Sequence, residues 1–127
     1  MKMHADDAEG VNLISHVEAG GVRVNREPHA GSVIVPWAGA VWPWAPADFA
    51  ALQAPHFEEL LALQPELVVF GSGRQLRFCH PSLLRSLIER RIGIETMDTA
   101  AACRTYNVLA GEGRRVVAAL LALPLAS

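Results

Sequence analysis

Residues 67–73 have the sequence LVVFGSG, and this stretch decides the fold. Four apolar residues in a row followed by two glycines around a serine are typical of a strand that is covered on both faces of a sheet. A helical pattern with a single apolar stripe begins at Pro81, and Gly93 marks its end before a second strand at 94–97. The order strand, helix, strand predicts two parallel strands joined by a crossover. We therefore expect an α/β domain.

The segment before this unit predicts a small β-structure at the N-terminal side. Residues 13–18 and 22–25 are rich in β-forming side chains around Ala19-Gly20-Gly21, which indicates a β-hairpin. A third strand is expected at 32–35, after a break at 28–31. Residues 1–10 are polar without periodicity, so we expect a flexible tail there and a single domain over 11–127.

The middle of the chain contains all three tryptophans. Residues 36–55 place them among prolines, which predicts irregular or strand-like structure rather than a helix. The tryptophans are expected in an aromatic core, with a partner-facing patch at 36–46 as the alternative. Apolar residues then recur at helical spacing from Phe57 to Leu63, and Pro65 ends this helix.

Two helices are predicted for the C-terminal part. One is capped by Asp98 or Thr99 and continues to about Leu109. The other begins near Glu112 and directs apolar side chains inward, namely Val116, Val117, Leu120 and Leu121. Arg114 and Arg115 at its start are unfavourable against the helix dipole unless they pair, for example with Glu112.

Composition narrows the class of protein. The 127 residues suit one domain, and a hydrophobic content of 51% is ample for its core. A net charge of -2 argues against binding along nucleic-acid phosphates. The longest apolar run, from Val116 to Leu123, is too short to span a membrane. Two cysteines and an acidic N-terminus without a signal-peptide or transit-peptide pattern predict a soluble cytoplasmic protein, either bacterial or already processed.

The expected ligand side lies where the two parallel strands end. Their following loops emerge at the same edge of the sheet, which brings Gly71-Ser72-Gly73 close to Asp98 and Thr99. Glycines leave backbone N–H groups accessible, so the first loop is a candidate anion-binding nest, although a simple turn explains it too. Asp98 has two interpretations, a helix cap or an acid or base.

Arginine supplies ten of the eleven basic residues, and it is preferred for planar recognition of carboxylate or phosphate. Arg74 and Arg77 follow the glycine loop, and Arg104 lies in the helix after Asp98. An inward-facing Arg104 would make a cationic pocket, whereas a structural ion pair is the alternative. Thr105 and Asn107 lie on the same helix.

No nucleophile or metal site stands out. Cys79 and Cys103 have no nearby base in the sequence and are expected to be inert, buried thiols. The five histidines show neither an i, i+4 pair nor a Cys-x-x-Cys companion, so we expect no structural metal and no cofactor.

One string of residues resembles a known family. It joins Met97-Asp98-Thr99 to Ala102-Cys103-Arg104-Thr105-Tyr106-Asn107 and continues to Glu112-Gly113-Arg114-Arg115. Most of 67–121, and more loosely the N-terminal half through Ser32-Val33-Ile34 and Trp37, resembles the uncharacterised domain family that includes the mitochondrial respiratory complex I assembly factor of the third type and bacterial proteins of unknown function.

The resemblance implies a three-layer α/β fold with a mixed central sheet, and no established enzymatic activity. The pocket that it implies involves Gly71, Ser72, Gly73, Asp98, Thr99, Arg104, Thr105 and Asn107. The first hypothesis is a non-enzymatic assembly or protein-interaction module, with respiratory complex subunits as partners. The alternative is a small-anion-binding domain or minor enzyme that uses Gly71-Ser72-Gly73, Asp98 and Arg104.

Overall fold

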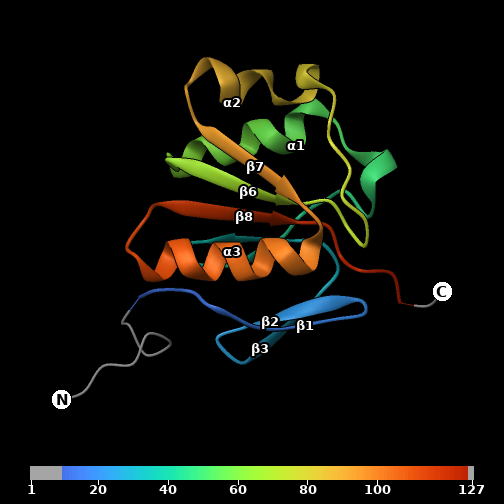
Figure 1. Ribbon diagram of the computed structural model, residues 1–127, viewed down its shortest axis with the longest axis vertical. Coiled ribbons are helices and arrows are strands. Elements are labelled where there is room, and N and C mark those ends of the chain that lie inside the picture. The colour runs from blue at the N-terminus through green and yellow to red at the C-terminus, as the bar shows by residue number, and fades with distance from the viewer. Residues whose placement is uncertain (1–9, 126–127) are drawn as a thin grey trace.

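The computed structural model describes residues 10–125, which form two sheets and a set of helices (Figure 1). The larger sheet has five strands in the order β5-β4-β8-β6-β7, and the smaller has three in the order β1-β2-β3. The strands are β1 (Ile14–Glu18), β2 (Gly21–Val24), β3 (Glu27–Ala30), β4 (Val33–Pro36), β5 (Trp42–Pro43), β6 (Leu67–Gly71), β7 (Gly93–Met97) and β8 (Val116–Leu120). The helical elements are η2 (Phe49–Ala51), α1 (Ala54–Glu58), η3 (Glu59–Leu63), η4 (Pro81–Leu84), α2 (Arg85–Glu89) and α3 (Thr99–Gly111).

The larger sheet is mixed. Strand β6 pairs in parallel with both β7 and β8, whereas β8 and β5 each pair antiparallel with β4. The predicted strand, helix, strand unit is confirmed, because β6 and β7 are parallel and α2 lies between them in the chain. The predicted hairpin is confirmed by the antiparallel pair of β1 and β2.

The domain has three layers. Strands β4, β6 and β8 are buried along their whole length, and alternate residues contribute to separate cores on the two faces of the sheet. On one face, Val69 and Ala118 pack with Tyr106 of α3 and with the small sheet. On the other, Phe70 packs with Phe57 of α1 and with residues of α2. This arrangement confirms the three-layer α/β class.

The expected helix after Glu112 is wrong, because residues 116–120 form strand β8 between β4 and β6. Every residue in the run 116–121 is apolar, so the helical spacing of its large side chains does not distinguish a helix from a strand. A strand that is covered on both faces needs such a continuous run. The same criterion that identified β6 therefore applies to β8.

The two arginines before β8 connect it to the start of β6. The Arg114 guanidinium pairs with the Glu66 carboxylate at 2.9 Å, and the Arg115 N–H donates to its other oxygen at 2.9 Å. These contacts, the backbone N–H of Arg115 first, lower the pKa of Glu66. The partner of Arg114 is thus Glu66 and not Glu112.

Three smaller differences concern the N-terminal half and the crossover. The expected break at 28–31 contains β3, in which Pro28 is tolerated because β3 is an edge strand. The helix from Pro81 is divided into η4 and α2. Trp44 is buried in the core, whereas Trp37 and Trp42 are partly buried against it, so the aromatic-core interpretation applies best to Trp44. Of the expected tail, residues 1–9 lie outside the described part.

The helices of residues 10–125 are all too short or too polar to span a membrane.

Candidate functional site

The loops after β6 and β7 meet, as their parallel arrangement predicts. The Ser72 N–H donates to the Met97 carbonyl at 2.9 Å, and the Thr99 N–H donates to the Gly73 carbonyl at 2.8 Å. These bonds hold the start of α3 against the glycine loop. The sequence-based placement of the two loops side by side is confirmed.

Thr99 joins three segments at this point. Its buried hydroxyl donates to the Leu121 carbonyl at 2.7 Å and accepts the Gly73 N–H at 2.9 Å. A Cβ atom on Gly71 would lie 2.9 Å from the Thr99 hydroxyl oxygen and 3.0 Å from its Cα, so this approach requires glycine. We call Gly71, Gly73, Thr99 and Leu121 the Thr99 junction.

Asp98 is the N-cap of α3. Its carboxylate accepts the Ala101 N–H at 2.9 Å, which confirms the cap interpretation. The N–H groups of Ser72 and Gly73 are both engaged within the protein. The anion nest expected at the glycine loop therefore loses both of these donors.

Asn107 and Tyr106 attach the small sheet to α3. The Asn107 amide donates to the Ile14 carbonyl at 2.7 Å and accepts the Ile14 N–H at 2.8 Å, as a neighbouring strand would do. The Tyr106 hydroxyl lies 2.8 Å from the carbonyls of both Asn12 and Pro36. Burial raises the pKa of Tyr106 above its usual range. Both side chains thus bond to backbone more than 60 residues away along the chain.

Arg104 and Thr105 lie apart from this set. Arg104 is exposed, and Thr105 is partly buried. Within residues 10–125 neither side chain forms a hydrogen bond or an ion pair. The structure therefore shows neither of the two roles expected for Arg104, an inward cationic pocket or an ion pair.

Both cysteines are free and buried, as expected. Burial raises the pKa of Cys79 to about 11 and that of Cys103 to about 12. A thiol with such a pKa is almost entirely protonated near neutral pH and is a poor nucleophile.

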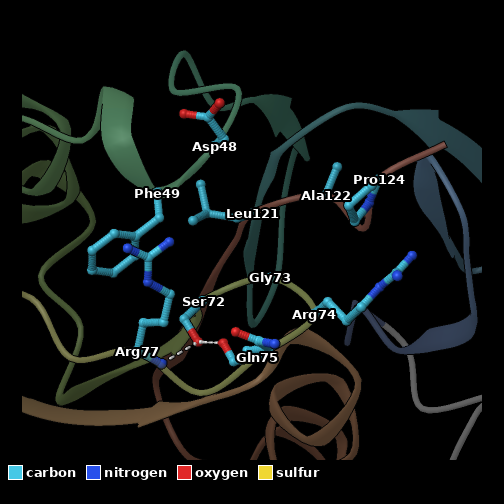
Figure 2. Close-up of a pocket in the computed structure, with 10 residues that line it drawn as sticks. All are labelled: Asp48, Phe49, Ser72, Gly73, Arg74, Gln75, Arg77, Leu121, Ala122 and Pro124. Carbon is cyan, nitrogen blue, oxygen red and sulfur yellow. Dashed lines mark hydrogen bonds between the residues drawn. The ribbon is translucent and has the colours of Figure 1, made fainter. Parts of the chain in front are cut away.

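A cleft opens on the other side of the glycine loop (Figure 2). It has a volume of about 210 Å³. Residues from three segments line it, namely Asp48, Phe49, Ser72, Gly73, Arg74, Gln75, Arg77, Leu121, Ala122 and Pro124. Of the eight site residues expected from the sequence, only Ser72 and Gly73 are among them.

Figure 2 shows Arg77 beside Phe49 on one side of the cleft and Arg74 on the other, with the Arg74 side chain extending away from Arg77. The Arg77 guanidinium carbon lies 4.2 Å from the centre of the Phe49 ring, a cation–π contact. The sequence indicated these two arginines as candidate site residues, because they follow the glycine loop. No sequence pattern indicated Asp48, Phe49 or Pro124, because they come from distant parts of the chain.

The Ser72 hydroxyl shapes the loop that carries these arginines. It donates to the Gln75 carbonyl at 2.6 Å and accepts the Arg77 N–H at 3.0 Å. One side chain therefore closes a compact turn over residues 72–77.

A family described as proteins of unknown function (DUF498/DUF598) matches residues 14–121. An uncharacterised protein of Rhodobacter capsulatus is 39% identical over 103 residues, which cover 80% of this chain and 77% of that protein. The mouse NADH dehydrogenase [ubiquinone] 1 alpha subcomplex assembly factor 3 is 35% identical over 83 residues, 64% of this chain and 45% of that protein, so the chain spans less than half of this relative.

The fold is also found among solved structures. The crystal structure of a Bordetella parapertussis protein superposes with a TM-score of 0.84 at 34% identity, covering 91% of this chain and 98% of that one.

Proposed function

The chain belongs to the family of proteins of unknown function DUF498/DUF598, and on this premise we propose that it is a non-enzymatic interaction module that acts in the assembly of a respiratory NADH dehydrogenase. The observation that carries the proposal is the 35% identity with the mouse assembly factor over 64% of the chain. A cytoplasmic location belongs to the same proposal and is supported by the two free thiols.

The geometry supports a non-enzymatic role. The polar groups at the ends of β6 and β7 are used in bonds within the protein, and Asp98 is a cap. The two thiols are buried and protonated. The Ser82 hydroxyl lies 2.9 Å from Nδ1 of His80, but the same nitrogen accepts the Ser82 N–H and caps η4, so the role of this contact is structural.

Deletion of the gene in the source organism tests this function. We expect less assembled NADH dehydrogenase on native gels and slower NADH oxidation by isolated membranes, with restoration by the wild-type gene. Succinate oxidation by the same membranes is the control and should stay unchanged. Normal amounts of the assembled complex in the deletion strain would exclude the proposed function.

Small-anion binding is a second candidate, because Ser72 and Gly73 line the cleft together with two arginines. Titration with phosphate and with citrate, followed by amide chemical shifts, tests it. Saturable shifts confined to residues of the cleft, and lost in Arg74→Ala, would support this candidate. Absence of shifts at millimolar ligand would exclude it.

A further inference from the structure

The loop at 74–78 exposes two apolar side chains next to two arginines. Leu76 is 53% exposed and Phe78 is 72% exposed, although both side chains are large and apolar. The residues between and after them face the body of the protein, because Arg77 packs on Phe49 and Cys79 is buried in the core. Side chains in this stretch point alternately toward the protein and toward solvent, so Leu76 and Phe78 are exposed.

This loop is held in place at both ends. The Ser72 hydroxyl bonds to Gln75 and to Arg77 at its start, and the buried Cys79 anchors its end. A segment that is fixed before binding loses less conformational entropy when a partner binds. The exposed apolar residues are therefore part of a preformed surface.

The cleft beside the loop has unmatched positive charge. Within residues 10–125, neither Arg74 nor Arg77 forms an ion pair. The only carboxylate of the lining belongs to Asp48, which accepts the Ala51 N–H and caps η2. The lining thus has two arginines and one carboxylate, and this carboxylate already accepts a hydrogen bond. The guanidinium carbon of Arg77 lies over the Phe49 ring, and the N–H groups of this guanidinium can still donate to an acceptor.

Size and lining define what the cleft can hold. Its volume of about 210 Å³ lies below the range of about 300–1,000 Å³ that is usual for pockets of small-molecule ligands, and suits a single side chain. Leu121, Ala122 and Pro124 contribute apolar surface to the cleft. Leu76 and Phe78 lie outside the lining, so a ligand that also covers them must extend beyond the cleft.

We propose that the cleft and the 74–78 loop together dock an acidic and apolar segment of a partner protein. An acidic side chain of this segment binds at the cleft that Arg74 and Arg77 line, and its apolar neighbours cover Leu76 and Phe78. A peptide fits better than a lipid surface, because both arginines line a concave cleft instead of a flat surface. The proposal rests on the proposed function, since it specifies the surface by which the module holds its partner.

Selection from a displayed library of random 12-residue peptides tests the surface directly. The full chain is immobilised, and enriched peptides are synthesised for measurement of their affinity. We expect enriched sequences with Asp or Glu next to aromatic or aliphatic residues. Replacement of that acid by Asn or Gln should weaken binding about tenfold, the effect of losing one anchoring contact.

Variants of the loop locate the binding site. Arg74→Ala and Phe78→Ser should each weaken binding of the selected peptides about tenfold. The matched controls are Arg104→Ala and Val108→Ser, which remove an exposed arginine and a 59% exposed apolar residue from α3, and these should bind as the wild type does. Because all four residues are exposed, the variants are expected to fold, which circular dichroism checks.

Four results would overturn the proposal. They are enrichment no higher than on a surface without the protein, selected peptides without acidic residues, equal binding by the loop variants, and N-acetylaspartate binding as tightly as the peptides. Binding to phosphatidylglycerol vesicles but not to phosphatidylcholine vesicles, lost in the loop variants, would assign the surface to a membrane instead.

Complementation separates this surface from the proposed function. In the deletion strain, Arg74→Ala and Phe78→Ser should restore less NADH dehydrogenase than the two control variants. If the wild type restores the complex and the loop variants do so equally well, the surface is refuted while the function stands. If deletion has no effect but the peptides bind as expected, the surface stands and the respiratory function is refuted.

Discussion

The Thr99 junction adjoins the 74–78 loop at Gly73, and the two regions differ in how far their polar groups are bonded within the protein. In the junction, the hydroxyl of Thr99 and the N–H of Gly73 bond to each other, and the packing leaves no room for a Cβ on Gly71. In the loop, two arginines lack ion-pair partners among residues 10–125, and two large apolar side chains are exposed. Polar groups near the ends of strands can therefore serve the fold, while neighbouring residues remain available for binding.

The largest effect on stability is expected for Thr99→Val. The new side chain keeps the shape but removes the hydroxyl, which leaves the buried Gly73 N–H and Leu121 carbonyl without this partner. We expect a loss of about 3 kcal/mol in the free energy of unfolding, measured in urea. Thr105→Val on the same helix is the control and should change stability by less than about 0.5 kcal/mol. Equal effects of the two changes would remove the distinction drawn for the junction.

Two glycines give opposite expectations for the same substitution. Gly71→Ala should cost about 2 kcal/mol, because the added methyl group would meet Thr99 and Leu120. Gly111→Ala at the end of α3 meets nothing within 4 Å and should stabilise the protein by about 0.5 kcal/mol. Thermal unfolding of both variants measures the difference, and a Gly71→Ala variant as stable as the wild type would contradict the tight packing.

Asn107→Ala tests the attachment of the small sheet. The change removes both bonds to Ile14 and should cost about 1.5 kcal/mol. Hydrogen exchange of the Ile14 amide should accelerate about tenfold, because opening of this edge becomes easier by a similar amount. Arg104→Ala, three residues earlier, should leave this amide unchanged. Unaltered exchange in Asn107→Ala would show that other contacts hold the small sheet.

The smallest effect on stability is expected in the loop. Arg74→Ala and Phe78→Ser should each change the free energy of unfolding by less than about 0.5 kcal/mol, because both side chains are exposed. Urea denaturation measures this beside Thr99→Val. A loss above 1 kcal/mol in either variant would mean that the loop supports the fold, which would weaken the contrast with the junction.

Local sequence patterns predicted the crossover unit and the cap of α3 correctly. The run 67–70, the stripe after Pro81 and the strand at 94–97 are read within short windows, and their order implies a parallel pair. Asp98 was identified as a candidate cap from its position alone. The proximity of the loops after β6 and β7 followed from the same reasoning, because parallel strands end at one edge of a sheet.

The eight pocket residues expected from the sequence show what local patterns do not predict. The family resemblance implied a pocket that includes Asn107, but the bonds of this side chain are to Ile14, 93 positions away. Such a partner is set by the packing of α3 against the small sheet, which no local window contains. Arg74 and Arg77 could be named from the sequence, whereas their cleft could not.

By itself, the sequence determined the α/β class, the buried β6 strand, α3 with its cap, and the burial of both thiols, since each depends on local spacing or on apolar content. Tertiary structure alone decided that residues 116–120 form a central strand and that Phe49 and Leu121 meet the 74–78 loop. The physical reason is that a fully apolar run suits a buried helix and a buried strand equally well by periodicity. The strand conformation is favoured because 116–120 lie between β4 and β6, whose backbone groups need hydrogen-bond partners there.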